Sequence, residues 1–115
     1  MKVCIAKYLY ALIMVLVFTA ATAFGQIKVI HFNASWNEAN NVEWFKKLSD
    51  CDLANVDIVE QPKLQDKHKI VIVPTIVIFK DGEEIKRYQA DLSFKMLATR
   101  KEIQEFINEQ IMSDF

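Results

Sequence analysis

A short turn sequence, Lys80-Asp81-Gly82-Glu83, separates two runs that suit β-strands, at residues 75–79 and 85–88. Asp-Gly between two such runs is a strong β-hairpin signal, because glycine readily takes the positive φ that a tight turn requires. Gly82 is also the only glycine after position 25. The sequence therefore predicts one well-marked hairpin in a densely structured chain with little room for long flexible loops.

The first 25 residues have the pattern of a secretory signal. Lys2 and Lys7 precede an apolar stretch at 9–18, and small residues follow at 19–23. The apolar stretch is about ten residues long, whereas a membrane span needs roughly 20. We therefore expect an exported protein, either periplasmic or secreted.

Two processing outcomes remain open for this segment. Small residues favour cleavage after Ala23 or after Gly25, and we expect the folded domain at residues 26–115. The alternative is an uncleaved membrane anchor, because residues 8–24 carry no charge. In that case the protein would contact the membrane only through this segment.

The remaining part of the chain is long enough for one small domain. Without Lys2 and Lys7 it has 12 basic and 15 acidic side chains, a formal charge of −3. A nucleic-acid-binding protein would need a basic face, so we expect no nucleic acid as a partner. The charges are scattered singly and fit an ordinary solvated surface.

Periodicity gives the order of the elements. Pro62 suits the first turn of a helix, and residues 99–102 (Thr-Arg-Lys-Glu) form a capping box that opens another. The predicted elements are a strand at 27–32, a helix at 36–49, a strand at 53–59, a helix at 62–68, strands at 75–79 and 85–88, and a helix from the capping box on. This order predicts an α/β fold, βαβα followed by ββα, with one central four-stranded mixed sheet.

Two segments carry a family resemblance. Val73-Pro74-Thr75, followed by Phe79-Lys80-Asp81-Gly82, resembles the cis-proline segment and hairpin of the thioredoxin family. Phe32, Ala34 and Trp36 match the approach to the active site of that family. The resemblance covers nearly all of residues 27–112 and implies a minimal thioredoxin-like fold.

The departures from the family pattern bear on function. Asn37 and Asn40 stand where the family has its two cysteines, with Glu38 and Ala39 between them. Disulfide exchange needs a thiolate and a second thiol, and an amide supplies neither. We therefore expect a redox-inactive protein with no catalytic residue. About six residues, near 91–96, also look inserted before the last helix.

Binding does not require those cysteines. The resemblance implies a cis peptide bond before Pro74 and a peptide-binding groove formed by Val73, Pro74 and Thr75, beside the altered motif at residues 36–40. Family members bind an extended segment through the backbone there. We therefore expect a polypeptide segment or a partner protein to bind at Trp36, Asn37, Glu38, Ala39 and Asn40. An ordinary structural subunit that docks through the hairpin edge or residues 91–98 is a further possibility.

Cys51 is the one cysteine after the signal-like segment. At the far end of the predicted 36–49 helix it would lie roughly 20 Å from the motif, too far to replace the missing thiols. It fits a buried thiol or a disulfide-linked dimer, and as a possible reactive thiol it supports the alternative function, a thiol-disulfide oxidoreductase acting through Cys51.

The two histidines do not indicate a catalytic or metal site. His31, where many family members carry a buried acid, fits a hydrogen-bonded core position, and His68 fits a helix C-terminus. His31, Glu38 and His68 lack any recognisable metal-ligand spacing. We expect neither a metal nor a cofactor.

Overall fold

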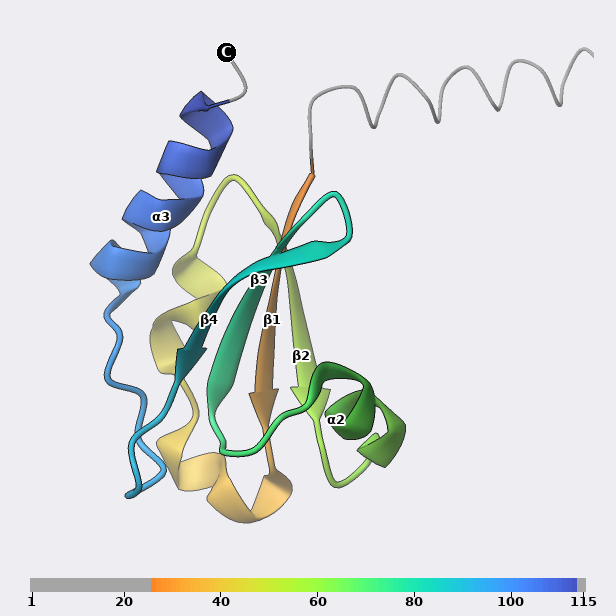
Figure 1. Cartoon of the computed structure of the whole chain (residues 1–115). Helices are drawn as coiled ribbons and strands as arrows, with labels where there is room; N and C mark the ends of the chain where they lie inside the picture. Colours follow the sequence, from red (N-terminus) through yellow and green to blue (C-terminus); the bar gives the residue numbers. More distant parts are fainter. Residues whose placement is uncertain (1–25, 114–115) are drawn as a thin grey trace, which may run out of the picture.

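The structure is a computed structural model that describes residues 26–113 (Figure 1). The predicted signal or anchor at residues 1–25 lies outside this range. The elements in order are β1 (Ile27–Asn33), η1 (Ser35–Asn40), η2 (Glu43–Lys47), β2 (Asp52–Asp57), α2 (Pro62–His68), β3 (Thr75–Lys80), β4 (Glu83–Gln89) and α3 (Arg100–Met112), where η denotes a 3₁₀ helix. Over the described range, none of the helices has the length and apolar character needed to cross a membrane.

The four strands form one mixed sheet in the order β2-β1-β3-β4. β1 and β2 run parallel, while β3 lies antiparallel to both β1 and β4. This confirms the predicted four-stranded α/β arrangement and the hairpin at Gly82, whose φ is 86°. In β1, Phe32 lies opposite Val56 on one side and Thr75 on the other. The carboxyl end of β1 therefore meets the segment around Pro74.

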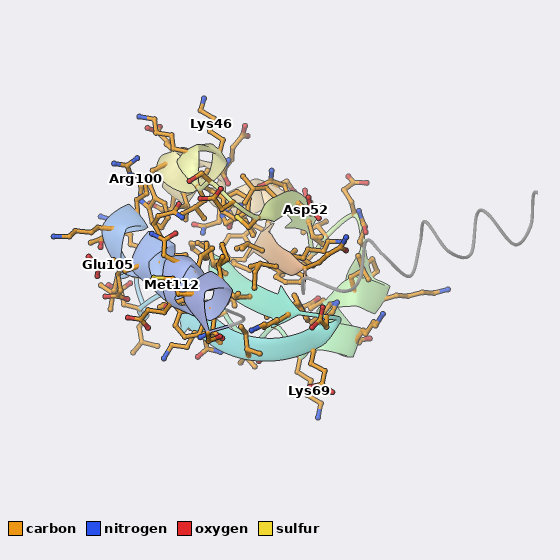
Figure 2. The ribbon with its side chains drawn as sticks, turned by 90° about the horizontal axis from the view of Figure 1, so that it is seen from above. Lys46, Asp52, Lys69, Arg100, Glu105 and Met112 are labelled. Atoms are coloured by element: carbon orange, nitrogen blue, oxygen red, sulfur yellow. The ribbon has the colours of Figure 1, made fainter. Side chains whose placement is uncertain are left out.

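Each face of the sheet has its own apolar core. Val29 of β1 packs with Phe45 of η2 and Ile103 of α3, whereas Phe32, on the alternate face, packs with Ile70 and other residues beside α2. This alternation follows from the two-residue period of a strand. Figure 2 shows the result from above, with Lys46 of η2 and Lys69, just after α2, projecting on opposite sides of the sheet.

The prediction of one continuous helix at 36–49 is wrong. The structure has two short 3₁₀ segments, with Asn37 at φ −112° and ψ 23° inside the first and extended backbone at Val42 between them. Asparagine side chains compete with the backbone for hydrogen bonds and so weaken helices. Four asparagines at positions 33, 37, 40 and 41 bond one another here. Their local network replaces the regular helix.

The remaining boundaries follow local signals. α2 begins at Pro62 as predicted, and Thr99 accepts a hydrogen bond from the Glu102 backbone N–H (3.2 Å) at the start of α3. The second strand ends at Asp57 and not at the predicted Val59. There the chain turns, because the Asp57 carboxylate accepts from the Val59 N–H and the Asp57 carbonyl from the Gln61 N–H, each at 2.9 Å.

Candidate functional site

The altered motif lies just beyond the carboxyl end of β1, where the sheet holds Asn33 in place. Asn37 is only 5% exposed and takes part in a network of amides. Its Nδ2 donates to Asn33 Oδ1 (3.1 Å), and its Oδ1 accepts from Asn40 Nδ2 (2.9 Å). Asn33 Nδ2 in turn donates to the Asn37 carbonyl (3.2 Å) and to Asn41 Oδ1. Asn37, which the family resemblance places where a nucleophilic cysteine would stand, is thus a buried structural amide.

A loop after β4 covers this network. Asn37 Nδ2 also donates to the backbone carbonyl of Phe94 (3.3 Å), and the Phe94 ring meets the Trp36 ring edge-on with centroids 5.3 Å apart. Phe94 has φ 64°, a left-handed conformation that is rare for a bulky residue. Through these contacts, Phe94 holds the loop against Trp36 and Asn37.

Asp91 organises the loop from within. Its Oδ1 accepts from the Ser93 N–H (2.9 Å), the Ser93 hydroxyl (2.5 Å) and the Lys95 N–H (3.2 Å). Its own N–H donates to the Lys95 carbonyl (3.0 Å). The hydrogen bonds from Ser93 and then Lys95 lower the pKa of this carboxyl. The loop corresponds to the predicted insertion at 91–96, although nothing in its sequence indicated that Phe94 contacts the motif.

The proline segment lies beside the motif, and the Val73–Pro74 peptide bond is cis. The side chains of Val73, Pro74 and Thr75 are all nearly inaccessible to solvent. The Thr75 hydroxyl donates to the Ile72 carbonyl (2.5 Å), and the Pro74 carbonyl accepts from the Ala90 N–H (3.0 Å). These three residues therefore pack beneath the surface at this corner, and their side chains contribute little to the area that a partner could contact.

Four large apolar side chains are exposed at this corner. Trp36, Val71, Leu92 and Phe94 are exposed to 63%, 87%, 92% and 39%, and they come from η1, the segment before Pro74 and the loop after β4. All three segments lie at the lower end of the sheet in Figure 1, toward which β1 points. We call these four residues the apolar end. Glu38 and Ala39 are exposed beside it, while Asn40 is half-buried.

Cys51 lies far from this end. It directly precedes β2, whose first residue pairs with Lys28 near the start of β1. The length of β1 therefore separates it from Asn33, about 20 Å at roughly 3.3 Å per residue. Burial raises the pKa of the Cys51 thiol to about 11, and the Asp52 and Asp50 carboxylates add to the rise. It is a protonated thiol at neutral pH.

The two histidines lie in packed surroundings. His31 is 5% exposed and its Nδ1 lies 3.0 Å from Asn55 Oδ1, which agrees with the predicted core position. His68 ends α2 between the rings of Phe32 and Phe79. Among residues 26–113, no three His, Cys, Asp or Glu side chains come together as a metal-ligand set.

Comparison with known proteins agrees with the architecture. A sequence profile of the Thioredoxin family matches residues 14–109. Thioredoxin Y1, chloroplastic, from Arabidopsis thaliana is 36% identical over 50 residues, which are 44% of this chain but only 29% of that protein. Among solved structures, Fasciola hepatica thioredoxin aligns with a TM-score of 0.56 at 26% identity, covering 82% of this chain and 89% of that one. A mutant thioredoxin from Halobacterium salinarum aligns with a TM-score of 0.59 at 22% identity, covering 73% and 74%.

Proposed function

The chain belongs to the thioredoxin family, and on this premise we propose that it is an exported, redox-inactive member that holds a polypeptide segment or a partner protein at its apolar end. The observation that carries the proposal is the position of Asn37. Where thiol exchange needs an accessible thiolate, this chain has a buried amide held by Asn33, Asn40 and the Phe94 carbonyl. That corner is therefore suited to binding a partner, and it lacks the thiol that disulfide exchange requires.

Exposed apolar side chains support a binding role. Large apolar groups gathered on one surface are typical of interaction sites, and tryptophan contributes more than most residues to such contacts. Trp36 is also held by the Phe94 ring, so that less conformational freedom is lost when a partner binds. A partner would cover Trp36, Leu92 and Phe94 together.

The alternative, an oxidoreductase acting through Cys51, has weaker support. The attacking species in disulfide exchange is the thiolate, and a pKa of about 11 leaves almost none of it at neutral pH. Cys51 also lies at the other end of β1 from the apolar end.

The proposal of export rests on the sequence of residues 1–25, in which basic residues are followed by an apolar stretch and then by small residues.

Site-specific photo-cross-linking tests the binding proposal. Benzoylphenylalanine would replace Trp36 in the full chain, expressed in its native compartment, and in a parallel sample Met112. Met112 is 72% exposed and lies on the last turn of α3, near the start of β1. We expect polypeptide adducts at position 36 and none at 112. Equal labelling at both positions would contradict the proposal.

A disulfide-reduction assay tests the absence of redox chemistry. The full chain and its Cys51→Ser variant would be assayed with a disulfide-linked protein substrate and dithiothreitol. We expect both to match the rate with dithiothreitol alone. Turnover that disappears in Cys51→Ser would overturn the redox-inactive assignment in favour of the oxidoreductase.

A further inference from the structure

β2 is an edge strand with an open side. Within residues 26–113 it pairs only with β1, and Figure 1 shows it at the right-hand edge of the sheet. The Ile58 N–H donates to the Asn33 carbonyl (2.9 Å), so the even-numbered residues here turn their backbone groups toward β1. By the alternation of a strand, the N–H groups of Leu53, Asn55 and Asp57 point away from the sheet. They are free to pair with an added strand.

A cavity of about 1180 Å³ lies beside this edge. It lies between the η1–η2 segment and the face of β1 and β2. Side chains from both walls line it, among them His31, Asn55 and Asp57 from the sheet and Glu38, Phe45 and Lys46 from η1 and η2. Leu53, Asn55 and Asp57 share this face of β2, since they alternate with the buried Val56.

His31 lines the cavity and has one buried ring nitrogen without a hydrogen-bond partner. Its Nδ1 faces the Asn55 side-chain oxygen at 3.0 Å, and because that oxygen can only accept, Nδ1 carries the proton. The Nε2 of the neutral ring then has a lone pair. It is buried and has no hydrogen-bond partner, although a buried polar atom is normally paired. Because Nε2 is covered, a donor group in the cavity would reach it only if neighbouring side chains such as Phe45 moved.

The charge along the edge indicates which donor fits. From residue 48 to residue 62 the chain has four acidic side chains and no lysine or arginine; the four are Asp50, Asp52, Asp57 and Glu60. Asp57 lines the cavity itself, together with Glu38 and Glu43. Lys46 and Lys47 lie on the η2 wall. A cationic side chain would therefore find its favourable contacts at the β2 side of the cavity, near Asp57 and His31.

We propose that β2 binds an extended basic polypeptide segment by strand addition, with one lysine or arginine side chain entering the cavity between His31 and Asp57. The added strand supplies backbone hydrogen bonds to Leu53, Asn55 and Asp57, while the cavity selects the side chain. This site does not depend on the apolar end, since it uses the edge of the sheet and none of Trp36, Leu92 or Phe94, although its cavity extends to Glu38 of η1.

Hydrogen exchange with a defined peptide tests the site. The probe is an alternating Lys-Val peptide of about ten residues, long enough to pair with a strand of this length, and the matched control is the Glu-Val peptide. NMR on the ¹⁵N-labelled full chain would follow amide exchange at the outward-pointing Leu53, Asn55 and Asp57. We expect the Lys-Val peptide to slow exchange there by about tenfold or more, as new hydrogen bonds form, and the Glu-Val peptide to have no effect.

A charge-neutral variant tests the role of the cavity. Asp57→Asn keeps the oxygen that accepts from the Val59 N–H, and we expect it to weaken Lys-Val binding by about tenfold because a charge-assisted contact is lost. Asp66→Asn, on the exposed side of α2, removes the same charge and should leave binding unchanged. Equal effects of both variants, equal binding of both peptides, or protection confined to the apolar end would each overturn the proposal. Such a result would not contradict binding at the apolar end, because cross-linking at Trp36 tests that proposal separately.

Discussion

Asn37 donates its side-chain amide to the backbone carbonyl of Phe94 at 3.3 Å, across 57 residues of sequence. Together with the bonds to Asn33 and from Asn40, this contact uses both hydrogens and the oxygen of the Asn37 side chain. The corner of the fold and the loop after β4 are therefore joined through one residue. Asn37 fixes the loop, and the loop supplies the Phe94 ring that orients Trp36.

This relationship predicts a large stability loss in Asn37→Ala. The substitution leaves the buried Asn33 oxygen without this donor, at a cost of about 1–3 kcal/mol, and also removes the bonds to the partly buried Phe94 carbonyl and from Asn40. We expect the free energy of unfolding in urea to fall by about 2–4 kcal/mol. Asn108→Ala, on the exposed side of α3, should change it by less than about 0.5 kcal/mol. Similar losses in both variants would contradict the role of Asn37.

The backbone at Phe94 predicts an unusual order of stabilities. Its φ of 64° disfavours any residue with a Cβ atom, by about 1–2 kcal/mol relative to glycine. Phe94→Gly should therefore be more stable than Phe94→Ala by about 1 kcal/mol in thermal or urea unfolding. Leu92 is the matched control, since it lies in the same loop without a positive φ and is 92% exposed. There glycine should be no more stable than alanine.

Local sequence signals were sufficient for most of the fold. The Asp81-Gly82 turn, Pro62 at the start of α2 and the Thr99 cap of α3 each act within a few residues, and each lies where the pattern places it. The mostly apolar run at 27–32 likewise forms a strand, β1, which is buried except at Lys28. These features are readable because the interacting groups are neighbours in sequence.

The candidate site was harder to predict because its contacts are not local. The apolar spacing of Val42, Phe45 and Leu48 favoured one helix, but the bonds among the asparagine side chains outweighed that preference. The position of Phe94 over Trp36 depends on a loop far along the chain. The insertion at 91–96 was the one available signal, and it indicated a loop without indicating what the loop touches.

The surroundings of Cys51 predict slow alkylation at neutral pH. Burial, then Asp52 and Asp50, raise the pKa of the thiol to about 11. In a Cys4→Ser background, the rate with iodoacetamide should rise about tenfold per pH unit from roughly pH 7 to pH 10, as the thiolate fraction rises. Asp52→Asn should increase the rate at a given pH, because one of the causes of the raised pKa is removed. A rate that levels off below pH 9 would show an ordinary, accessible thiol.

His31 predicts a loss of stability in mild acid. Burial lowers the pKa of its ring below the ordinary value of 6.5, although the hydrogen bond with Asn55 opposes the shift. Below pH 6.5 the unfolded chain binds a proton that the folded chain does not, so the free energy of unfolding falls as the pH falls. The contribution of one such group is at most about 1.4 kcal/mol per pH unit, and it stops at the folded pKa.

Urea unfolding at a series of pH values from about 7.5 to 5 measures this contribution. His31→Gln should have a shallower decline than the parent below pH 6.5, because glutamine does not titrate and the carboxylates common to both proteins cancel in the comparison. His68→Gln is the parallel control. Burial also lowers the pKa of His68, so this variant lacks the pH dependence of stability due to His68 but should retain the pH dependence due to His31. An unchanged slope in His31→Gln would mean that the ring is protonated in the folded state as readily as in the unfolded chain.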